Sequence, residues 1–399
     1  MTSQYRWVIV AAGGFIGCIA IGSIFALPVF LQPMSQETGW SRTEISAAMT
    51  IAFVAMGLAS FLWGMAVDRF GPRIVLLCGS TLLGVGLALA SRAPTPLAFQ
   101  LLFGVLVGAA GGAIFPPLMA TVTGWFETRR SLAVSLVSAG MGMAPMIVAP
   151  IAAQLVIYED WRSAMLMIAI AVWLLLIPAA FLIRRPPALA NRARVPGAAP
   201  PMSASQALRS PQFIVLALTY FCCCAAHSGP IFHTVSYAIT CGLPVATAVT
   251  IYSVEGLAGL AGRVVFGLSG DRFGAKPVLV TGLLIQALAA GAYALAGQLD
   301  QFYAVAIVFG MAYAGVMPLY AVIARETFPL QIMGTVIGAA SLFSSLGMSL
   351  GPLAGGLIFD ATASYRWLYL GSLAIGLGAM AIMLTFRPAR RPLVLTVPN

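Results

Sequence analysis

Windows of roughly 20 apolar residues recur twelve times along this chain of 399 residues. An α-helix rises about 1.5 Å per residue, so each window is long enough to cross the hydrocarbon layer of a bilayer. We expect helices near residues 7–32, 44–67, 74–91, 97–124, 131–157, 162–183, 212–238, 243–269, 276–296, 301–324, 331–358 and 364–386. The pattern predicts an all-α membrane protein with 12 transmembrane helices.

Composition excludes the main soluble alternative. Hydrophobic residues make up 60% of the chain and charged residues 8%, against about 25% charged in soluble domains. A soluble fold of this size has too little interior to hide so much apolar surface. The net charge of +10 comes with a single lysine and no basic run with interleaved aromatic residues, so we expect no nucleic-acid partner. No His/Cys spacing indicates a metal site.

A basic stretch rich in Pro, Ala and Ser interrupts the helices from Arg184 to Arg209. It has no apolar periodicity, and we interpret it as a linker. The predicted organisation is a six-helix bundle over residues 1–183, a cytoplasmic linker over 184–211 and a second six-helix bundle over 212–399.

Basic residues are segregated between alternate loops. One set of loops holds only Arg42, Arg92, Arg162 and Arg366. The opposite set holds most of the remaining arginines and Lys276. Because loops rich in Arg and Lys stay in the cytoplasm, we expect both termini and the linker to be cytoplasmic, in a cell's inner membrane.

An eight-residue loop sequence occurs once in each half. The loop after the second predicted helix reads G-M-A-V-D-R-F-G, and the loop after the eighth reads G-L-S-G-D-R-F-G. Their Asp residues lie at helix ends, where a carboxylate can meet a helix N-terminus or an arginine of the neighbouring bundle. We predict a conformational latch formed by Gly64, Asp68, Arg69, Gly71, Asp271, Arg272 and Gly274.

Both loops resemble the G-x-x-x-D-R-x-G-R-R pattern of the major facilitator superfamily, with departures at Pro72, Ala275 and Lys276. The resemblance covers essentially the whole chain. It implies the major facilitator fold, with two pseudo-symmetric six-helix bundles, and a secondary transporter that works by alternating access.

The entry to the fifth helix is similar to the monocarboxylate transporter and oxalate/formate antiporter group. It reads W-F-E-T-R-R-S-L-A from Trp125, followed by Ser138-Ala139-Gly140. Thr128 replaces the usual Lys, and the group's first-helix D-G-G-W pattern is absent. In that group an arginine four residues before the Gly that ends the eighth helix binds the substrate carboxylate. The resemblance carries this role to Arg263, four residues before Gly267.

Two charged residues lie deep inside apolar stretches, both on the eighth predicted helix: Glu255 and Arg263. Such residues are costly in a bilayer and indicate function. A guanidinium offers a forked set of donors that fits a carboxylate. The alternative for Arg263 is a structural side chain that reaches toward the cytoplasmic face, since Asp271 lies two turns away.

Glu255 is the candidate proton carrier, because a carboxyl group removed from water can bind and release a proton near neutral pH. It lies about 12 Å from Arg263 along the helix, so we expect no direct ion pair. Carriers of the mammalian type have an acid one turn before the arginine, where this chain has Gly259. The alternative is a structural Glu255 bonded to Ser253 or to a backbone group.

Further polar and aromatic residues are candidates for the substrate site. His227 could bind substrate or carry a proton. Tyr220 lies seven residues earlier, on the same helical face, and Phe115 precedes the paired prolines of the fourth helix, where related bacterial carriers place an aromatic near the substrate. Ser344 could supply a hydrogen bond. Each of His227 and Ser344 could equally be a packing residue.

The predicted function is transport of a small organic anion, a monocarboxylate, coupled to a proton, by a monomer without a cofactor. The alternative is a proton-driven drug or metabolite efflux antiporter. The eleventh helix carries G-x-x-x-G-P-x-x-G-G from Gly347, which looks like a motif that drug antiporters carry on the fifth; small residues at this spacing also permit close helix packing, which is the other explanation. We expect no enzyme, because no cluster of nucleophile, base or metal ligands is present.

Overall fold

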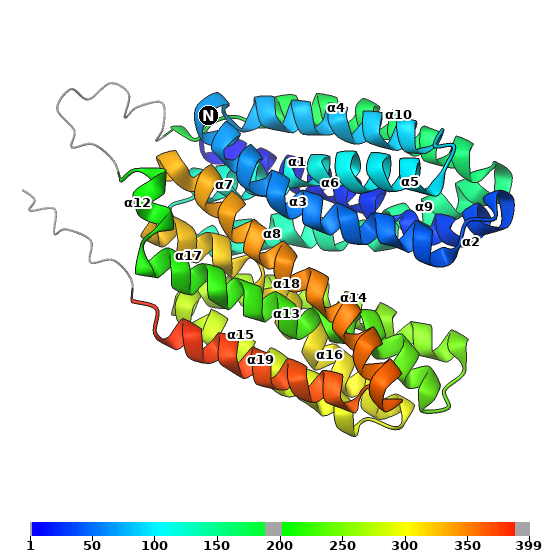
Figure 1. Ribbon diagram of the computed structural model, residues 1–399. Coiled ribbons are helices and arrows are strands. Elements are labelled where there is room, and N and C mark those ends of the chain that lie inside the picture. Colours follow the sequence, from blue (N-terminus) through cyan, green and yellow to red (C-terminus); the bar gives the residue numbers. More distant parts are fainter. Residues whose placement is uncertain (1, 188–201, 388–399) are drawn as a thin grey trace, which may run out of the picture.

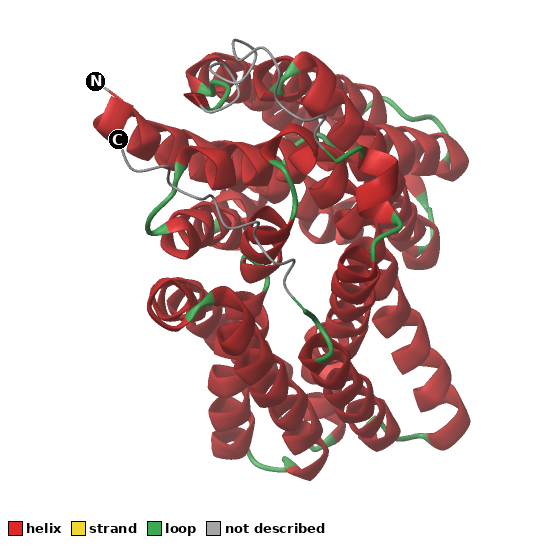
Figure 2. Ribbon diagram, turned by 90° about the vertical axis from the view of Figure 1, so that its left-hand side faces the viewer, coloured by secondary structure: helices red, strands yellow, loops and turns green. Residues whose placement is uncertain are grey.

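The computed structural model of the protein describes residues 2–187 and 202–387, and within these ranges the regular structure is helical (Figure 2). Twelve helical segments in these ranges are long and apolar enough to cross a membrane. They run from Gln4–Leu31 to Arg366–Leu384 and follow the twelve predicted windows in order. The all-α class with twelve transmembrane helices is therefore confirmed.

The N-terminal half lies beside the C-terminal half (Figure 1). The N-terminal half comprises α1 (Thr2–Phe25), α2 (Leu27–Thr38), α3 (Arg42–Phe70), α4 (Pro72–Ala90), α5 (Pro96–Phe99), η1 (Gln100–Val107), α6 (Gly108–Gly112), α7 (Phe115–Trp125), α8 (Arg130–Gly142), α9 (Ala144–Tyr158) and α10 (Trp161–Leu182).

The C-terminal half comprises α12 (Ala204–Leu208), α13 (Pro211–Thr240), α14 (Val245–Phe273), α15 (Ala275–Ala292), η2 (Tyr293–Leu295), α16 (Leu299–Val316), α17 (Leu319–Thr327), η3 (Leu330–Ile332), α18 (Met333–Thr362) and α19 (Arg366–Leu384). The halves meet along two helix pairs, α3 with α18 and α8 with α14. We call the end of the molecule that carries the two D-R-F-G loops the latch end, and the opposite end the distal end.

Prolines divide several of the predicted helices. The fourth window, predicted as one helix, is split between α6 and α7 before Pro116, and the fifth is split between α8 and α9 before Pro145. The tenth is split between α16 and α17 at Pro318. Proline has no N–H to donate and its ring clashes with the preceding turn, so the helix ends and restarts. Each of these windows still forms one segment long and apolar enough to cross a membrane, so the spans predicted at 97–124, 131–157 and 301–324 are confirmed, with a break inside each.

Side-chain caps fix the starts of the distal helices. Ser41 and Glu44 form a reciprocal capping box at the start of α3, and the Asp160 carboxylate accepts the Ser163 amide at 2.7 Å at the start of α10. These bonds satisfy amides that have no partner within the helix. They also place helix starts next to Pro and Gly turns that the apolar pattern alone does not resolve.

Arg162 joins three segments at the distal end of the N-terminal half. It donates to the carbonyl of Ser91 at 3.0 Å and to that of Ala93 at 3.2 Å. It also lies 3.5 Å from the Glu37 carboxylate and packs over the Trp161 ring at 4.3 Å. One guanidinium thus ties α10 to α2 and to the turn after α4.

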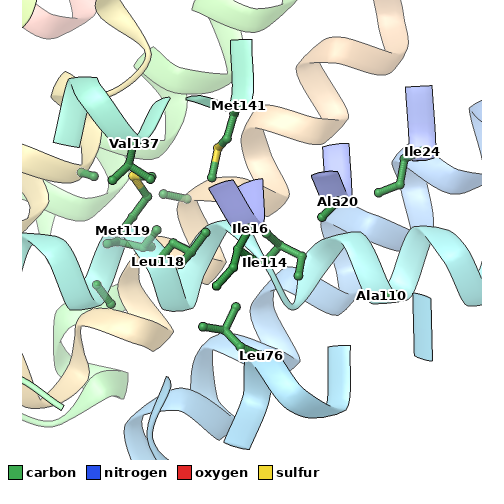
Figure 3. Close-up of a cluster of buried hydrophobic side chains, with 14 of the residues drawn as sticks. Ile16, Ala20, Ile24, Leu76, Ala110, Ile114, Leu118, Met119, Val137 and Met141 are labelled. Carbon is green, nitrogen blue, oxygen red and sulfur yellow. The ribbon is translucent and has the colours of Figure 1, made fainter. Parts of the chain in front are cut away.

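Apolar contacts fill the interior of the N-terminal half. Ile16 of α1 lies near Ile114, which precedes α7, and near Leu118 of α7 (Figure 3). Val137 of α8 and Leu76 of α4 belong to the same buried cluster. Helices from the first, third, fourth and fifth spans therefore share one core.

Part of the predicted linker at 184–211 is helical. Ser203 and Gln206 form a capping box at the start of α12, and Ala207 is buried. The short helix packs against α18 and α13. A local cap and one small buried side chain thus dock this part of the linker against the C-terminal half. Residues 188–201 of the linker lie outside the described residues.

Candidate functional site

The first D-R-F-G loop binds the start of a helix in the other half. The Asp68 carboxylate accepts the Gly334 amide at 2.8 Å, the Thr335 amide at 2.7 Å and the Thr335 hydroxyl at 2.6 Å. These amides belong to the first turn of α18 and have no partner within the helix. A carboxylate at a helix N-terminus is stabilised by the helix dipole as well as by these bonds.

The second loop repeats this arrangement with the halves exchanged. The Asp271 carboxylate accepts the Ser131 amide at 2.8 Å and the Leu132 amide at 3.0 Å. Both amides open α8 in the N-terminal half. A carboxylate of each half therefore binds a helix start of the other half. Five hydrogen bonds join the two halves at the latch end.

The four glycines of the loops have two different functions in this geometry. A Cβ at Gly64 would lie 2.9 Å from the Gly334 carbonyl carbon, and a Cβ at Gly267 would lie 2.7 Å from the Ser135 Cβ. These glycines let helices of opposite halves approach closely. Gly71 and Gly274 have φ of 91° and 90°, which glycine adopts without strain, and each turns the chain into the next helix.

The latch arginines lie outside this contact. Arg69 and Arg272 are exposed and pack over the adjacent Phe70 and Phe273 rings at 5.3 and 5.2 Å. Arg185 donates to the Arg69 carbonyl at 3.1 Å. Of the two partners anticipated for the loop carboxylates, a helix N-terminus or an arginine, the structure has the helix N-terminus in both copies.

Arg263 lies at the boundary between the halves, on α14 where it meets α8. The guanidinium is half-buried, and its Nε donates to the Ser138 hydroxyl of α8 at 3.1 Å. A Cβ at Gly142 would lie 2.7 Å from the guanidinium carbon, so the missing side chain there leaves room for Arg263. No carboxylate of the described residues pairs with Arg263. A half-buried cation with a neutral partner can accept an anionic ligand.

Tyr313 of α16 interacts with three of the predicted residues, and sequence reasoning missed it. Its ring lies 5.3 Å from the His227 ring. It also interacts electrostatically with both Glu255 and Arg263. Tyr313 could not be singled out from the sequence, because one Tyr on an apolar helix is ordinary. Ser138 belongs to the motif at the entry to the fifth helix, but the sequence assigned it no contact with Arg263.

Glu255 is 1% exposed and lies inside the C-terminal half. Its Oε2 accepts the Tyr293 hydroxyl at 3.3 Å, and its Oε1 has no hydrogen-bond partner among the described residues. A Cβ at Gly310 of α16 would lie 3.1 Å from its Cγ. The structural alternative was a bond from Glu255 to Ser253 or to a backbone group. The described contact of the carboxyl is with Tyr293 of η2, and its side chain packs beside Gly310 of α16.

His227 is buried on α13, 4.0 Å from the Cys223 sulfur through its Nδ1. Cys223 also donates to the Gln286 side chain of α15 at 3.5 Å. His227 is thus held between Cys223 and Tyr313 in the interior of the C-terminal half. This contact set fits the packing alternative and also leaves His227 next to the tyrosine that faces Arg263.

Phe115 and Tyr220 come together although they belong to opposite halves. Both line a small cavity with Tyr320 and residues of α17 and α18. The Tyr220 and Tyr320 rings stack with centroids 4.0 Å apart. Ser344 of α18 faces the Tyr220 hydroxyl and lies 3.1 Å from the Cys224 sulfur.

Apart from His227, which is buried inside the C-terminal half, the predicted substrate residues form two groups. Arg263 lies where α14 meets α8, while Phe115, Tyr220 and Ser344 lie where α7, α13 and α18 meet. Both groups are at the boundary of the two halves. A larger hollow lies between α14 and α15, around Phe266 and Phe273, and contains no predicted substrate residue. Within the described residues, no three His, Cys, Asp or Glu side chains converge on a possible metal position.

The fold and the exchanged latches define a transporter built from two repeated halves. The model of the Major Facilitator Superfamily matches residues 13–270 and 252–398, and the chain belongs to this family. It is therefore a multi-pass membrane transporter of small molecules and not an enzyme. The family resemblance seen in the two loops is confirmed.

Three relatives in sequence differ in what they transport. The chain is 27% identical to an agnestins efflux protein of Paecilomyces divaricatus, over 95% of this chain and 87% of that protein. It is 25% identical to monocarboxylate transporter 13 of Bos taurus, over 96% and 89%. It is 24% identical to the oxalate:formate antiporter of Oxalobacter formigenes, over 67% and 64%.

A solved structure has the same fold. A proton:xylose symporter bound to 6-bromo-6-deoxy-D-glucose superimposes with a TM-score of 0.77 at 16% identity, over 97% of each chain. At this identity the likeness concerns the arrangement of helices alone. It confirms the major facilitator fold with two six-helix bundles.

Proposed function

We propose that the protein transports a small organic anion, a monocarboxylate, by alternating access and couples this transport to a proton. The observation that carries the proposal is the half-buried Arg263 guanidinium, whose hydrogen-bond partner among the described residues of the other half is the neutral Ser138 hydroxyl. A buried cation without a counter-charge is expensive, so an entering carboxylate gains more there than at an exposed arginine. The sequence relatives include a monocarboxylate transporter and an oxalate:formate antiporter.

The anion would lie between the two halves. Its carboxylate pairs with Arg263, and its apolar part faces the boundary that Phe115 and Tyr220 line. Ser344 supplies a further hydroxyl. An apolar wall with one cation suits a small acid better than a polyol, because a polyol requires several hydrogen-bond partners.

Glu255 carries the coupled proton in this proposal, with His227 as the second candidate. Tyr313 interacts with both Glu255 and Arg263, so one side chain adjoins the proposed proton site and the proposed anion site. The latch loops close one end while the anion site is accessible from the other. The distribution of arginines supports a cytoplasmic latch end at a cell's inner membrane, and in this proposal the protein functions as a monomer.

The test is carboxylate uptake into proteoliposomes. Arg263→Ala removes the cation, and we expect uptake to fall by roughly 100-fold, the order expected when a charge-assisted bidentate contact is lost. Arg92→Ala, at an exposed arginine in the turn before α5, is the matched control and keeps full uptake. Undiminished uptake by Arg263→Ala refutes the role of Arg263.

The second candidate is efflux of a drug or metabolite. It is favoured by the relative that is an agnestins efflux protein. A thermal-shift screen of carboxylates against lipophilic cations separates the two. Stabilisation by carboxylates that is lost in Arg263→Ala supports the anion carrier. Stabilisation by cations that depends on Glu255 supports the efflux pump.

A further inference from the structure

A row of buried hydroxyl groups leads away from Glu255 inside the C-terminal half. Tyr293 donates to Glu255 Oε2 at 3.3 Å. The Thr234 hydroxyl of α13 donates to the Pro230 carbonyl at 2.7 Å, lies 3.4 Å from the Tyr369 hydroxyl of α19 and faces Tyr293. Thr234 is 2% exposed, and Tyr293 and Tyr369 are both 0% exposed. Three separate helical segments thus bring hydroxyls into one file.

Aromatic rings enclose this file on its sides. The Tyr293 ring packs against Phe302 at 6.3 Å, Phe309 at 5.7 Å and Tyr369 at 5.4 Å. Such walls keep bulk water away from the carboxyl group. A carboxyl enclosed in this way can exchange protons only through groups that both donate and accept, and hydroxyls are such groups.

The file runs toward the distal end. Tyr293 follows the last turn of α15, and Tyr369 lies in the first turn of α19 beside the exposed Arg366. The half-buried Tyr237 packs its ring 5.1 Å from that of Tyr369 and reaches the surface of the bundle there. The file therefore leads away from Arg263 and from the latch end.

The titratable groups that face Glu255 are mostly phenols. Tyr252 is on its own helix, Tyr293 is in η2, and Tyr313 and Tyr369 lie on α16 and α19. No described cation forms an ion pair with the carboxyl, and Oε1 has no hydrogen-bond partner among the described residues. The phenols are neutral near pH 7, so the proton is the ion that this carboxyl can exchange.

We propose that Tyr369, Thr234 and Tyr293 form a proton wire between Glu255 and the distal end, separate from the anion site between the halves. This deepens the proposed proton coupling and rests on it. As a proton enters, the Tyr293 O–H bond breaks while an O–H bond forms on Glu255 Oε2. The Thr234 O–H turns from the Pro230 carbonyl to Tyr293 and gives it a proton, and Thr234 regains one from Tyr369. Tyr369 in turn regains a proton from a hydronium ion at the distal end, which is left as water. Each hydroxyl is neutral again, and Glu255 has gained one proton.

Infrared difference spectroscopy after a pH jump measures this transfer directly on the full chain in detergent, without substrate. The signal is the carbonyl stretch of the protonated Glu255, assigned by its loss in Glu255→Gln. We expect Tyr293→Phe and Tyr369→Phe to slow its appearance by roughly tenfold or more, the factor that corresponds to one lost hydrogen bond. Both changes keep the ring and remove only the oxygen.

Tyr303→Phe is the matched control. It removes a hydroxyl 2.6 Å from the Thr250 hydroxyl in the same half, away from Glu255. The proton wire is overturned if Glu255 is protonated at the same rate in the wild type and in the three Tyr→Phe variants. It is also overturned if Tyr303→Phe slows the protonation as much as the other two variants do. Absence of the Glu255 signal in the wild-type protein overturns it too. Carboxylate uptake by wild type and Arg263→Ala reports on the anion carrier independently, so the two proposals fail separately. If one Tyr→Phe variant does not fold, the other completes the test.

Discussion

Replacing Asp68 by Asn tests whether the two latches open as one. The carboxylate accepts three bonds from the start of α18, at 2.8, 2.7 and 2.6 Å. Asn retains one oxygen of similar size, loses the charge, and turns an NH₂ group toward donors. The change is therefore confined to the contact between the halves.

The expected magnitude follows from these bonds. A hydrogen bond to a charged group contributes about 1.5–3 kcal/mol, and Asn keeps one weakened acceptor. We take the loss as about 3 kcal/mol, which corresponds to roughly 100-fold in the equilibrium between the closed and open latch end. The loss destabilises the closed state alone, because the carboxylate is hydrated once the halves separate.

Hydrogen exchange read by mass spectrometry measures this equilibrium without labels. The first-turn amides of Gly334 and Thr335 have no partner within α18, so the Asp68 carboxylate is what protects them. Their exchange should accelerate about 100-fold in Asp68→Asn, since exchange follows the opening equilibrium. The amides of Ser131 and Leu132 should also accelerate, although Asp271 is unchanged, because rigid halves open both latches together.

The amides of Ser131 and Leu132 decide whether the two latches open together. If Ser131 and Leu132 keep their wild-type exchange while Gly334 and Thr335 accelerate, the latches open independently and the reasoning is refuted. Asp300→Asn is the control, because Asp300 is an exposed acid in the first turn of α16 at the distal end. It should leave all four amides unchanged.

Three further changes have expected outcomes. Gly64→Ala places a Cβ against the backbone of Gly334, so exchange at the latch end should rise as in Asp68→Asn; unchanged exchange contradicts the close approach. Gly142→Ala displaces the Arg263 guanidinium, whose carbon would lie 2.7 Å from the new Cβ, and should weaken carboxylate binding by roughly tenfold in a calorimetric titration. Arg162→Ala removes one ion pair and two carbonyl contacts and should destabilise the protein by about 2 kcal/mol in thermal unfolding. An unchanged midpoint there would mean that these distal contacts are not stabilising.

The sequence predicts the helices of this protein well because the bilayer imposes one length on them. Each apolar window gave a transmembrane segment, and the repeated loops placed the two halves. The interruptions between α6 and α7, near Pro116, and between α16 and α17, at Pro318, were harder to predict. A proline does not always break a helix, and Pro230 lies inside the continuous α13. Whether a proline breaks a helix depends on what neighbouring helices offer the freed carbonyl.

The site could be predicted only as a set of residues. Arg263 and Glu255 stood out because a charge in an apolar helix is costly wherever it points. Their partners did not, because helices that are apolar on all sides give no indication of which face meets which neighbour. Ser138, Tyr293 and Tyr313 became visible only once α8, η2 and α16 were placed beside α14.

In the two latches, the acids tolerate substitution less well than the helix starts that they bind. Asp68 and Asp271 are side chains that a single substitution removes, whereas most of their donors are backbone amides that nearly any residue supplies. Position 132 can therefore vary in chemistry and still offer its N–H, and only proline deletes it. Position 334 is confined to glycine by packing, because a Cβ there would lie 2.5 Å from the Gly64 carbonyl oxygen. Selection on this closure thus acts through two acids and the glycine contact, while the start of α8 is free to change in sequence within the limits of packing.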